Sequence, residues 1–76
     1  MARVYLLVNV LPGKDLFIRD TMRGIKGVVS ADVVTGHYDI AAVIEGKDTQ
    51  EIFDKIFQRI RKIKGINRTE TFVAVK

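Results

Sequence analysis

The sequence predicts a single α+β domain in which two helices cover one face of a four-stranded antiparallel sheet. Three observations support this architecture. Segments with two-residue periodicity and segments with helical periodicity follow one another in the order β-α-β-β-α-β. A four-residue motif recurs after half of the chain, and every predicted strand carries apolar residues on both faces. The length of 76 residues is that of one domain, spanning residues 1–76.

The first half of the chain predicts a strand and a helix. Residues 3–10 alternate between two faces and form the predicted strand. The Pro12–Gly13 pair ends this strand, because both residues favour turns. Residues 14–23 then predict a helix, with Ile18 and Met22 on its apolar face.

The middle of the chain predicts a β-hairpin. Its two strands cover residues 28–35 and 38–45, and Gly36 lies between them. Glycine suits such a turn because it adopts positive φ at little cost.

The second helix has the clearest pattern of the chain. Asp48 and Glu51 form a capping-box pattern at its start. Residues 52–63 then place six apolar residues at spacings of three and four, and Gly65 follows as the expected C-cap. A last strand is predicted over residues 69–75.

The repeated motif relates the two halves. Residues 25–28 (Ile-Lys-Gly-Val) recur as residues 63–66 (Ile-Lys-Gly-Ile), and both copies stand where a predicted helix leads into a strand. Two β-α-β halves related in this way form the split β-α-β, or ferredoxin-like, arrangement. The sequence therefore predicts one four-stranded antiparallel sheet with both helices on one face.

The second sheet face is also apolar. Tyr5 and Leu7 lie on it, together with Val73 and Val75 or their alternates. An antiparallel sheet that faces water is normally polar on that side, and only two helices are available to cover this one. We therefore expect the other face to be buried in a homodimer with sheet packed on sheet.

The composition excludes several functional classes. The chain contains no Cys and a single His, so thiolate chemistry, zinc–thiolate sites and a Ser-His-Asp set are absent. We expect no enzyme activity, no cofactor and no metal site. No run of apolar residues is long enough to span a membrane, and the expected location is the cytoplasm.

The predicted hairpin turn carries more polar chemistry than a chain reversal requires. Its side chains offer a hydroxyl, an imidazole, a phenol and a carboxylate, from Thr35, His37, Tyr38 and Asp39. Two interpretations remain open on these residues alone. The turn is either a binding element or a decorated reversal in which Thr35 and Asp39 bond local backbone.

Several motifs resemble those of a known family. Thr35-Gly36-x-Tyr38-Asp39 before an apolar strand is similar to the effector-loop motif of the Lrp/AsnC family, within its ligand-sensing RAM domain, a relative of the ACT domain. Residues 8–13, residues 25–28 and the Arg68-Thr69-x-Thr71 motif match further pieces in the same order. The resemblance implies an amino acid site between dimers, with the turn on one subunit and the last strand on another. The implied ligand-binding residues are Thr35, Gly36, His37, Tyr38, Asp39, Thr69 and Thr71.

The resemblance also implies an assembly and partners. Homodimers would associate into an octamer or decamer and act on full-length Lrp/AsnC regulators, so transcription would be modulated indirectly. Direct DNA binding is not expected, because these residues form no helix-turn-helix. Two alternatives are a protein–protein interaction module without a ligand and an RNA-binding domain of similar topology. The RNA-binding alternative is weaker, since the third predicted strand has no aromatic residue after Tyr38.

Overall fold

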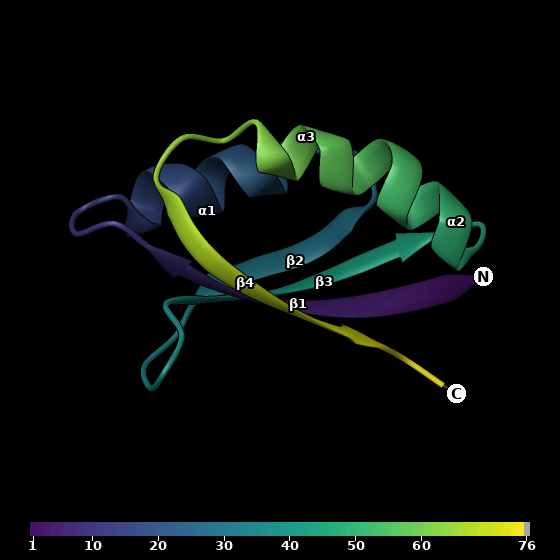
Figure 1. Ribbon diagram of the computed structural model, residues 1–76, viewed down its shortest axis with the longest axis horizontal. Coiled ribbons are helices and arrows are strands. Elements are labelled where there is room, and N and C mark those ends of the chain that lie inside the picture. The colour runs from purple at the N-terminus through teal and green to yellow at the C-terminus, as the bar shows by residue number, and fades with distance from the viewer. Residues whose placement is uncertain (76) are drawn as a thin grey trace.

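The computed structural model describes residues 1–75 and confirms the predicted fold class. Four strands form one antiparallel sheet in the order β2-β3-β1-β4, so β2 and β4 are its edges. Helix α1 and the longer second helical segment both lie on one face of this sheet (Figure 1). The strands are β1 (Ala2–Val10), β2 (Val28–Val33), β3 (Ile40–Gly46) and β4 (Ile66–Val73), and α1 is Asp15–Arg23.

The second helical segment begins with the predicted capping box. The Asp48 carboxylate accepts from the Glu51 backbone N–H at 2.8 Å, and the Glu51 carboxylate accepts from the Lys47 N–H at 2.9 Å. The first bond satisfies a backbone donor that a helix start otherwise leaves free, whereas the second reaches Lys47, one residue before the cap residue Asp48. The predicted position of the helix start is therefore confirmed.

The same segment contains one turn that periodicity does not predict. It runs through α2 (Thr49–Glu51), the π-helical turn η1 (Ile52–Ile56) and α3 (Phe57–Arg61). In the π-helical turn the Phe57 N–H donates to the Ile52 carbonyl, one residue further back than in an α-helix. Ile56 and Phe57, at the end of this turn, are both buried.

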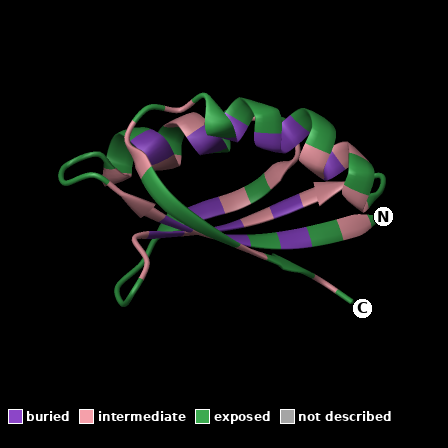
Figure 2. Ribbon diagram, in the orientation of Figure 1, coloured by how far each residue is buried: buried purple, intermediate pink, exposed green. Residues whose placement is uncertain are grey.

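The core lies between the helices and the sheet, and Figure 2 shows buried and exposed positions alternating along the strands. The alternation follows from strand geometry, which points successive side chains to opposite faces. The core residues come from all three strands that lie under the helices and from both helical segments. They are Val4, Leu6, Val8, Ile18, Met22, Ala31, Ile40, Ala42, Ile44, Ile52, Ile56, Phe57 and Ile60.

The repeated motif produces a reciprocal contact between the halves of the chain. Gly27 and Gly65 both have φ of +104°, a region that side chains rarely adopt. A methyl group at Gly27 would overlap Ile56 of the second helical segment, and one at Gly65 would lie 3.1 Å from Ile18 Cδ1 of α1. Each glycine therefore lets the isoleucine of the other half pack directly on the chain where a helix leads into a strand.

Strand ends differ from the sequence-based expectation. β2 stops at Val33 and β3 starts at Ile40, so the connecting loop is longer than the predicted turn. The Val34 N–H donates to the Asp39 carbonyl at 2.9 Å and closes this loop, hereafter the 34–39 loop. β4 starts early, at Ile66, because Ile66 pairs with Val10 beyond a register shift in β1.

The outer face of the sheet is partly apolar, as predicted. Tyr5 pairs with Val43 on one side and with Phe72 on the other, so all three share the face away from the helices. Tyr5 and Phe72 are 41% and 47% exposed. The assignment of Val73 to this face is wrong, because Val73 pairs with the buried Val4 and so points to the helix side. Val75 lies beyond the end of β4.

No helix within residues 1–75 is long and apolar enough to cross a membrane.

The contact between Gly27 and Ile56 generates a prediction about stability. Gly27→Ala should lower the free energy of unfolding by about 2 kcal/mol or more, because it adds overlap with Ile56 to the backbone strain of a positive φ. Gly36→Ala is the matched control, since Gly36 has φ of +127° and open space around it, and should cost about 1 kcal/mol. Urea unfolding at fixed protein concentration measures both.

A double-mutant cycle separates overlap from backbone strain. Ile56→Val removes the Cδ1 atom that the new methyl would meet. In this background the cost of Gly27→Ala should shrink by about 1 kcal/mol. An unchanged cost would show that the contact with Ile56 does not constrain this position.

Candidate functional site

The 34–39 loop extends from the sheet on the side away from the helices, at the lower left of Figure 1. Asp39 attaches it to β1 through backbone and side chain. The Asp39 N–H donates to the Val8 carbonyl, and the Asp39 Oδ2 atom accepts from the Val10 N–H, both at 2.9 Å. Asp39 thus extends the pairing of β3 with β1 after the regular ladder has ended at Ile40.

Asp39 still has capacity for a ligand. Only Oδ2 accepts a hydrogen bond from residues 1–75, and a carboxylate offers acceptor sites on both oxygens. The residue is half-buried beside the exposed His37. The interpretation of this turn as bonding only local backbone is therefore wrong for Asp39, whose side-chain partner lies 29 positions away in sequence.

Tyr38 connects the loop to the edge strand β4. Its hydroxyl donates to the Glu70 carboxylate. This hydrogen bond raises the pKa of the Tyr38 phenol, because the bond holds the neutral form beside a negative charge, and the cation of Arg68 opposes the shift. This hydrogen bond links the predicted turn to the edge strand β4.

A shallow hollow of about 360 Å³ opens between this loop and the sheet. Its lining residues are Asn9, His37, Tyr38 and Arg68. The Asn9 amide donates to the His37 carbonyl at 2.8 Å and so fixes the backbone on one side of the hollow. Thr35, Gly36 and His37 are exposed, and no atom lies within 4 Å of a methyl group placed on Gly36.

Thr69 and Thr71 lie on the other face of β4. They pair with Val8 and Leu6, whose side chains are buried under the helices, so both threonines point to the helix side. They line a separate cavity of about 390 Å³ between α3 and β4. Within one chain the structure therefore brings Tyr38 together with Arg68 and Glu70, and not with the two predicted threonines.

Three residues were missing from the predicted set. Asn9 and Arg68 line the hollow, and Glu70 accepts the hydrogen bond of Tyr38. Strand alternation is the signal for two of them, because Arg68 and Glu70 flank Thr69 and must point to the opposite face. Which of the two faces of the sheet these side chains occupy depends on the register of β4 on β1, and only the structure supplies this register.

The hollow and the adjoining 34–39 loop offer groups that suit a zwitterion. Arg68 lines the hollow and is a cation with several donors. Asp39 belongs to the loop and not to the lining, and its second oxygen is an acceptor. Backbone N–H groups near Gly36 are open to approach, since no side chain covers that residue. No group of three or more His, Asp or Glu side chains that could hold a metal occurs within residues 1–75.

Comparison with known proteins decides the family. The family model of the Lrp/AsnC ligand binding domain matches residues 3–76. The chain belongs to this family. No curated protein sequence matches the chain.

Solved structures agree with this assignment. Protein TTHA0845 from Thermus thermophilus is 28% identical with a TM-score of 0.92, and the match covers 100% of this chain and 95% of that chain. Hypothetical protein PHS023 from Pyrococcus horikoshii is 26% identical with a TM-score of 0.92, covering 100% and 92%. A feast or famine regulatory protein from M. tuberculosis, complexed with L-methionine, shares the fold at 18% identity and a TM-score of 0.79. Its match covers 100% of this chain and 51% of that chain.

The bond between Tyr38 and Glu70 generates a prediction about titration. The Tyr38 phenol should lose its proton only above the ordinary pKa of about 10. Glu70→Gln should lower this pKa, because the negative acceptor is replaced by a neutral one. Ultraviolet absorbance of the phenolate measures it, in a Tyr5→Phe background so that Tyr38 is the one remaining tyrosine.

The same shift has a consequence for folding. Since the folded-state pKa is raised, the Tyr38 hydrogen bond stabilises the fold below the unfolded pKa near 10 and loses this effect as the pH rises through the folded pKa. A Tyr38 titration that does not respond to Glu70→Gln would contradict the assigned cause.

Proposed function

We propose that this domain binds a free amino acid and that binding shifts its assembly. The observation that carries the proposal is the match of residues 3–76 to a ligand binding domain family. The 34–39 loop supports it, because Asp39 can accept from an ammonium group with its second oxygen. The M. tuberculosis relative of this fold is complexed with L-methionine, which makes amino acids the first ligands to test.

The proposed ligand contacts involve two chains. The 34–39 loop of one chain would hold the ligand through Asp39 and through backbone donors near Gly36, with His37 beside the ligand side chain. Thr69 and Thr71 would add hydroxyl groups from another chain, which accords with their distance from the loop within one chain. A ligand that binds between chains stabilises the assembled form by mass action.

The assembly unit that we propose is a homodimer formed through the outer face of the sheet. Tyr5, Val43 and Phe72 place apolar surface at the centre of this face. Burying apolar area contributes about 25 cal/mol per Å², so several hundred Å² would contribute several kcal/mol before the cost of association. Further association into an octamer or decamer would create the ligand sites between dimers.

In this proposal the domain is a non-enzymatic, cytoplasmic modulator of full-length Lrp/AsnC regulators. The second candidate function is a protein–protein interaction module without a ligand. One observation favours it, because Tyr38 and Asp39 both already hold hydrogen bonds within the chain. Ligand binding distinguishes the two candidates.

Amino acid binding is tested by a thermal unfolding screen against the common amino acids, with light scattering to follow mass. A ligand present at about 100 times its Kd should stabilise the folded form by about 2.7 kcal/mol. Asp39→Asn should abolish this effect, since it removes the charge that pairs with the ammonium while keeping an oxygen for the Val10 N–H.

Asp32→Asn is the matched control, because it makes the same chemical change at an exposed position on β2. It should retain ligand stabilisation. Equal stabilisation of the parent and the Asp39→Asn protein would rule out the proposed role of Asp39, and no stabilisation by any amino acid would favour the interaction module.

The proposed dimer makes a separate prediction. Val43→Asp should convert the dimer to monomers in light scattering, because a carboxylate at the centre of an apolar interface loses its hydration. Leu16→Asp is the control, since Leu16 is 55% exposed on α1, on the helix side of the sheet, and its substitution should leave the dimer intact. If the Val43→Asp protein kept the parent's mass in light scattering, the dimer interface would have to lie on another surface.

A further inference from the structure

The charges of this chain are distributed unevenly. Residues 55–69 contain six of the 13 basic residues and no Asp or Glu, whereas the rest of the chain is net acidic. The basic segment is defined here as Lys55, Arg59, Arg61, Lys62, Lys64 and Arg68. It begins in the π-helical turn η1 and covers α3, the connection to β4 and the start of β4.

Each of the nine Asp and Glu side chains accepts a hydrogen bond within residues 1–75. These carboxylates are spread over the rest of the sequence, and none lies among residues 55–69. The basic segment therefore has no acidic group of its own, and an anionic partner would neutralise it.

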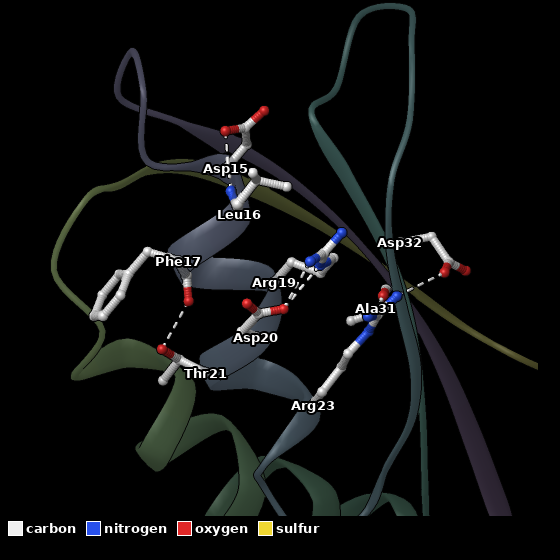
Figure 3. Close-up of polar contacts among 9 residues, drawn as sticks. All are labelled: Asp15, Leu16, Phe17, Arg19, Asp20, Thr21, Arg23, Ala31 and Asp32. Atoms are coloured by element: carbon white, nitrogen blue, oxygen red, sulfur yellow. Dashed lines mark hydrogen bonds and ion pairs between the residues drawn. The ribbon is translucent and has the colours of Figure 1, made fainter.

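Arginines in the two parts of the chain differ in their partners. Arg19 and Arg23 bond the carboxylates of Asp20 and Asp32 at 2.9 and 3.3 Å, as Figure 3 shows, and Arg3 pairs with Glu45. Arg59 and Arg61 form no ion pair with any carboxylate in the described part of the chain.

The lysines do not differ in this way between the two parts of the chain. Lys62 and Lys64 have no carboxylate partner within residues 1–75, but neither do Lys14, Lys26 and Lys47, and Lys55 lies 4.0 Å from the Glu51 carboxylate. The helix macrodipole favours cations in a last helical turn, but it does not account for Lys64 or Arg68, which lie beyond α3.

The arrangement of the cations indicates an extended ligand. Lys55 and Arg59 line a cavity together with Lys26 and with the carboxylates of Glu45 and Glu51. Arg61 lines the cavity on the other flank of α3, toward β4. A single small anion cannot contact both flanks, whereas a polymer with repeated charges can.

The chemistry of the surface favours nucleic acid over an acidic protein. None of the large exposed apolar side chains of residues 1–75 lies within positions 55–69. Protein interfaces have an apolar centre depleted of Lys, whereas interfaces with nucleic acid are polar and strongly positive. We propose that the basic segment binds the phosphate backbone of nucleic acid without reading the base sequence.

This inference shares only Arg68 with the proposed amino acid site and is compatible with the proposed dimer. The cations of α3 lie in the helix layer, on the opposite side of the sheet from Tyr5, Val43 and Phe72. A dimer formed through the outer sheet face would keep the α3 cations of both copies accessible. It also differs from sequence-specific recognition by a helix-turn-helix, because only phosphate contacts are involved.

The test is fluorescence anisotropy of the full chain with labelled duplexes of DNA and of RNA in a salt titration. The logarithm of the binding constant should fall linearly with the logarithm of salt concentration, with a slope of about 0.9 per phosphate neutralised. Neutralisation of about four phosphates predicts a loss of roughly 100-fold between about 50 and 200 mM salt. Duplexes of unrelated sequence should bind alike, and the comparison of DNA with RNA identifies the source of the phosphates.

Matched variants test the location. Arg59→Gln/Lys62→Gln should weaken binding by about tenfold or more at low salt and reduce the slope by about 1 for each phosphate that is no longer neutralised. Arg19→Gln/Lys47→Gln removes the same kinds and number of charges outside the segment and should have a small effect. Thermal unfolding checks that both proteins fold.

Three outcomes would overturn the proposal. They are the absence of binding to both duplexes at low salt, an equal loss of affinity in the two double variants, and binding of a labelled polyglutamate peptide in preference to the duplexes. The last outcome would assign the surface to an acidic protein.

Discussion

The fold depends on the contact between each half of the chain and the helix-to-strand junction of the other half. At these junctions Gly27 and Gly65 share a φ of +104°, and Ile56 and Ile18 fill the space that a side chain would take. Backbone bonds accompany the packing, because the Gly27 carbonyl accepts from Glu45 and the Gly65 carbonyl accepts from Leu11, both at 2.8 Å. Neither half can complete its junction alone, which couples the helices to the sheet in a chain too small for a large core.

This arrangement leaves the proposed functional surfaces on the parts of the molecule that the core does not use. Both helical segments pack on one sheet face, so the outer face with Tyr5 and Phe72 is not covered by the helices and is the face that we propose for a dimer. The 34–39 loop projects beyond that sheet and is held there by Asp39 and Asn9. The exposed side of α3 collects cations that the carboxylates of the described chain do not pair.

Much of the fold was predictable from the sequence because its signals are local. The capping box at Asp48, the helical periodicity and the recurrence of the motif around Gly27 each report on neighbouring residues. The ends of β2 and β3 were not predictable in this way, since Val34 and Thr35 continue the strand pattern into the loop. The loop begins where Val34 bonds the Asp39 carbonyl, a choice that depends on how Asp39 is attached to β1.

The candidate site likewise combines features that the local sequence indicates with features that depend on the fold. The turn residues were predicted from the family resemblance of their motif, since their types alone left two interpretations open. Arg68 and Glu70 join the candidate site through strand register. The π-helical turn is likewise invisible to periodicity, because Ile56 and Phe57 fit an apolar face of an ordinary helix equally well. The register of β4 on β1 and the π-helical turn both depend on the packing of the whole domain, so sequence patterns alone do not predict them.

The attachment of the 34–39 loop has an evolutionary consequence. Asp39 completes the backbone bonding of Val10, so selection for a stable fold restricts this position whatever ligand is bound. His37 is exposed, and its side chain forms no hydrogen bond within residues 1–75, so substitutions there are free of that restriction. Position 37 can therefore diverge among descendants while the geometry of the loop is inherited unchanged, and under the proposed site this is where ligand preference would change.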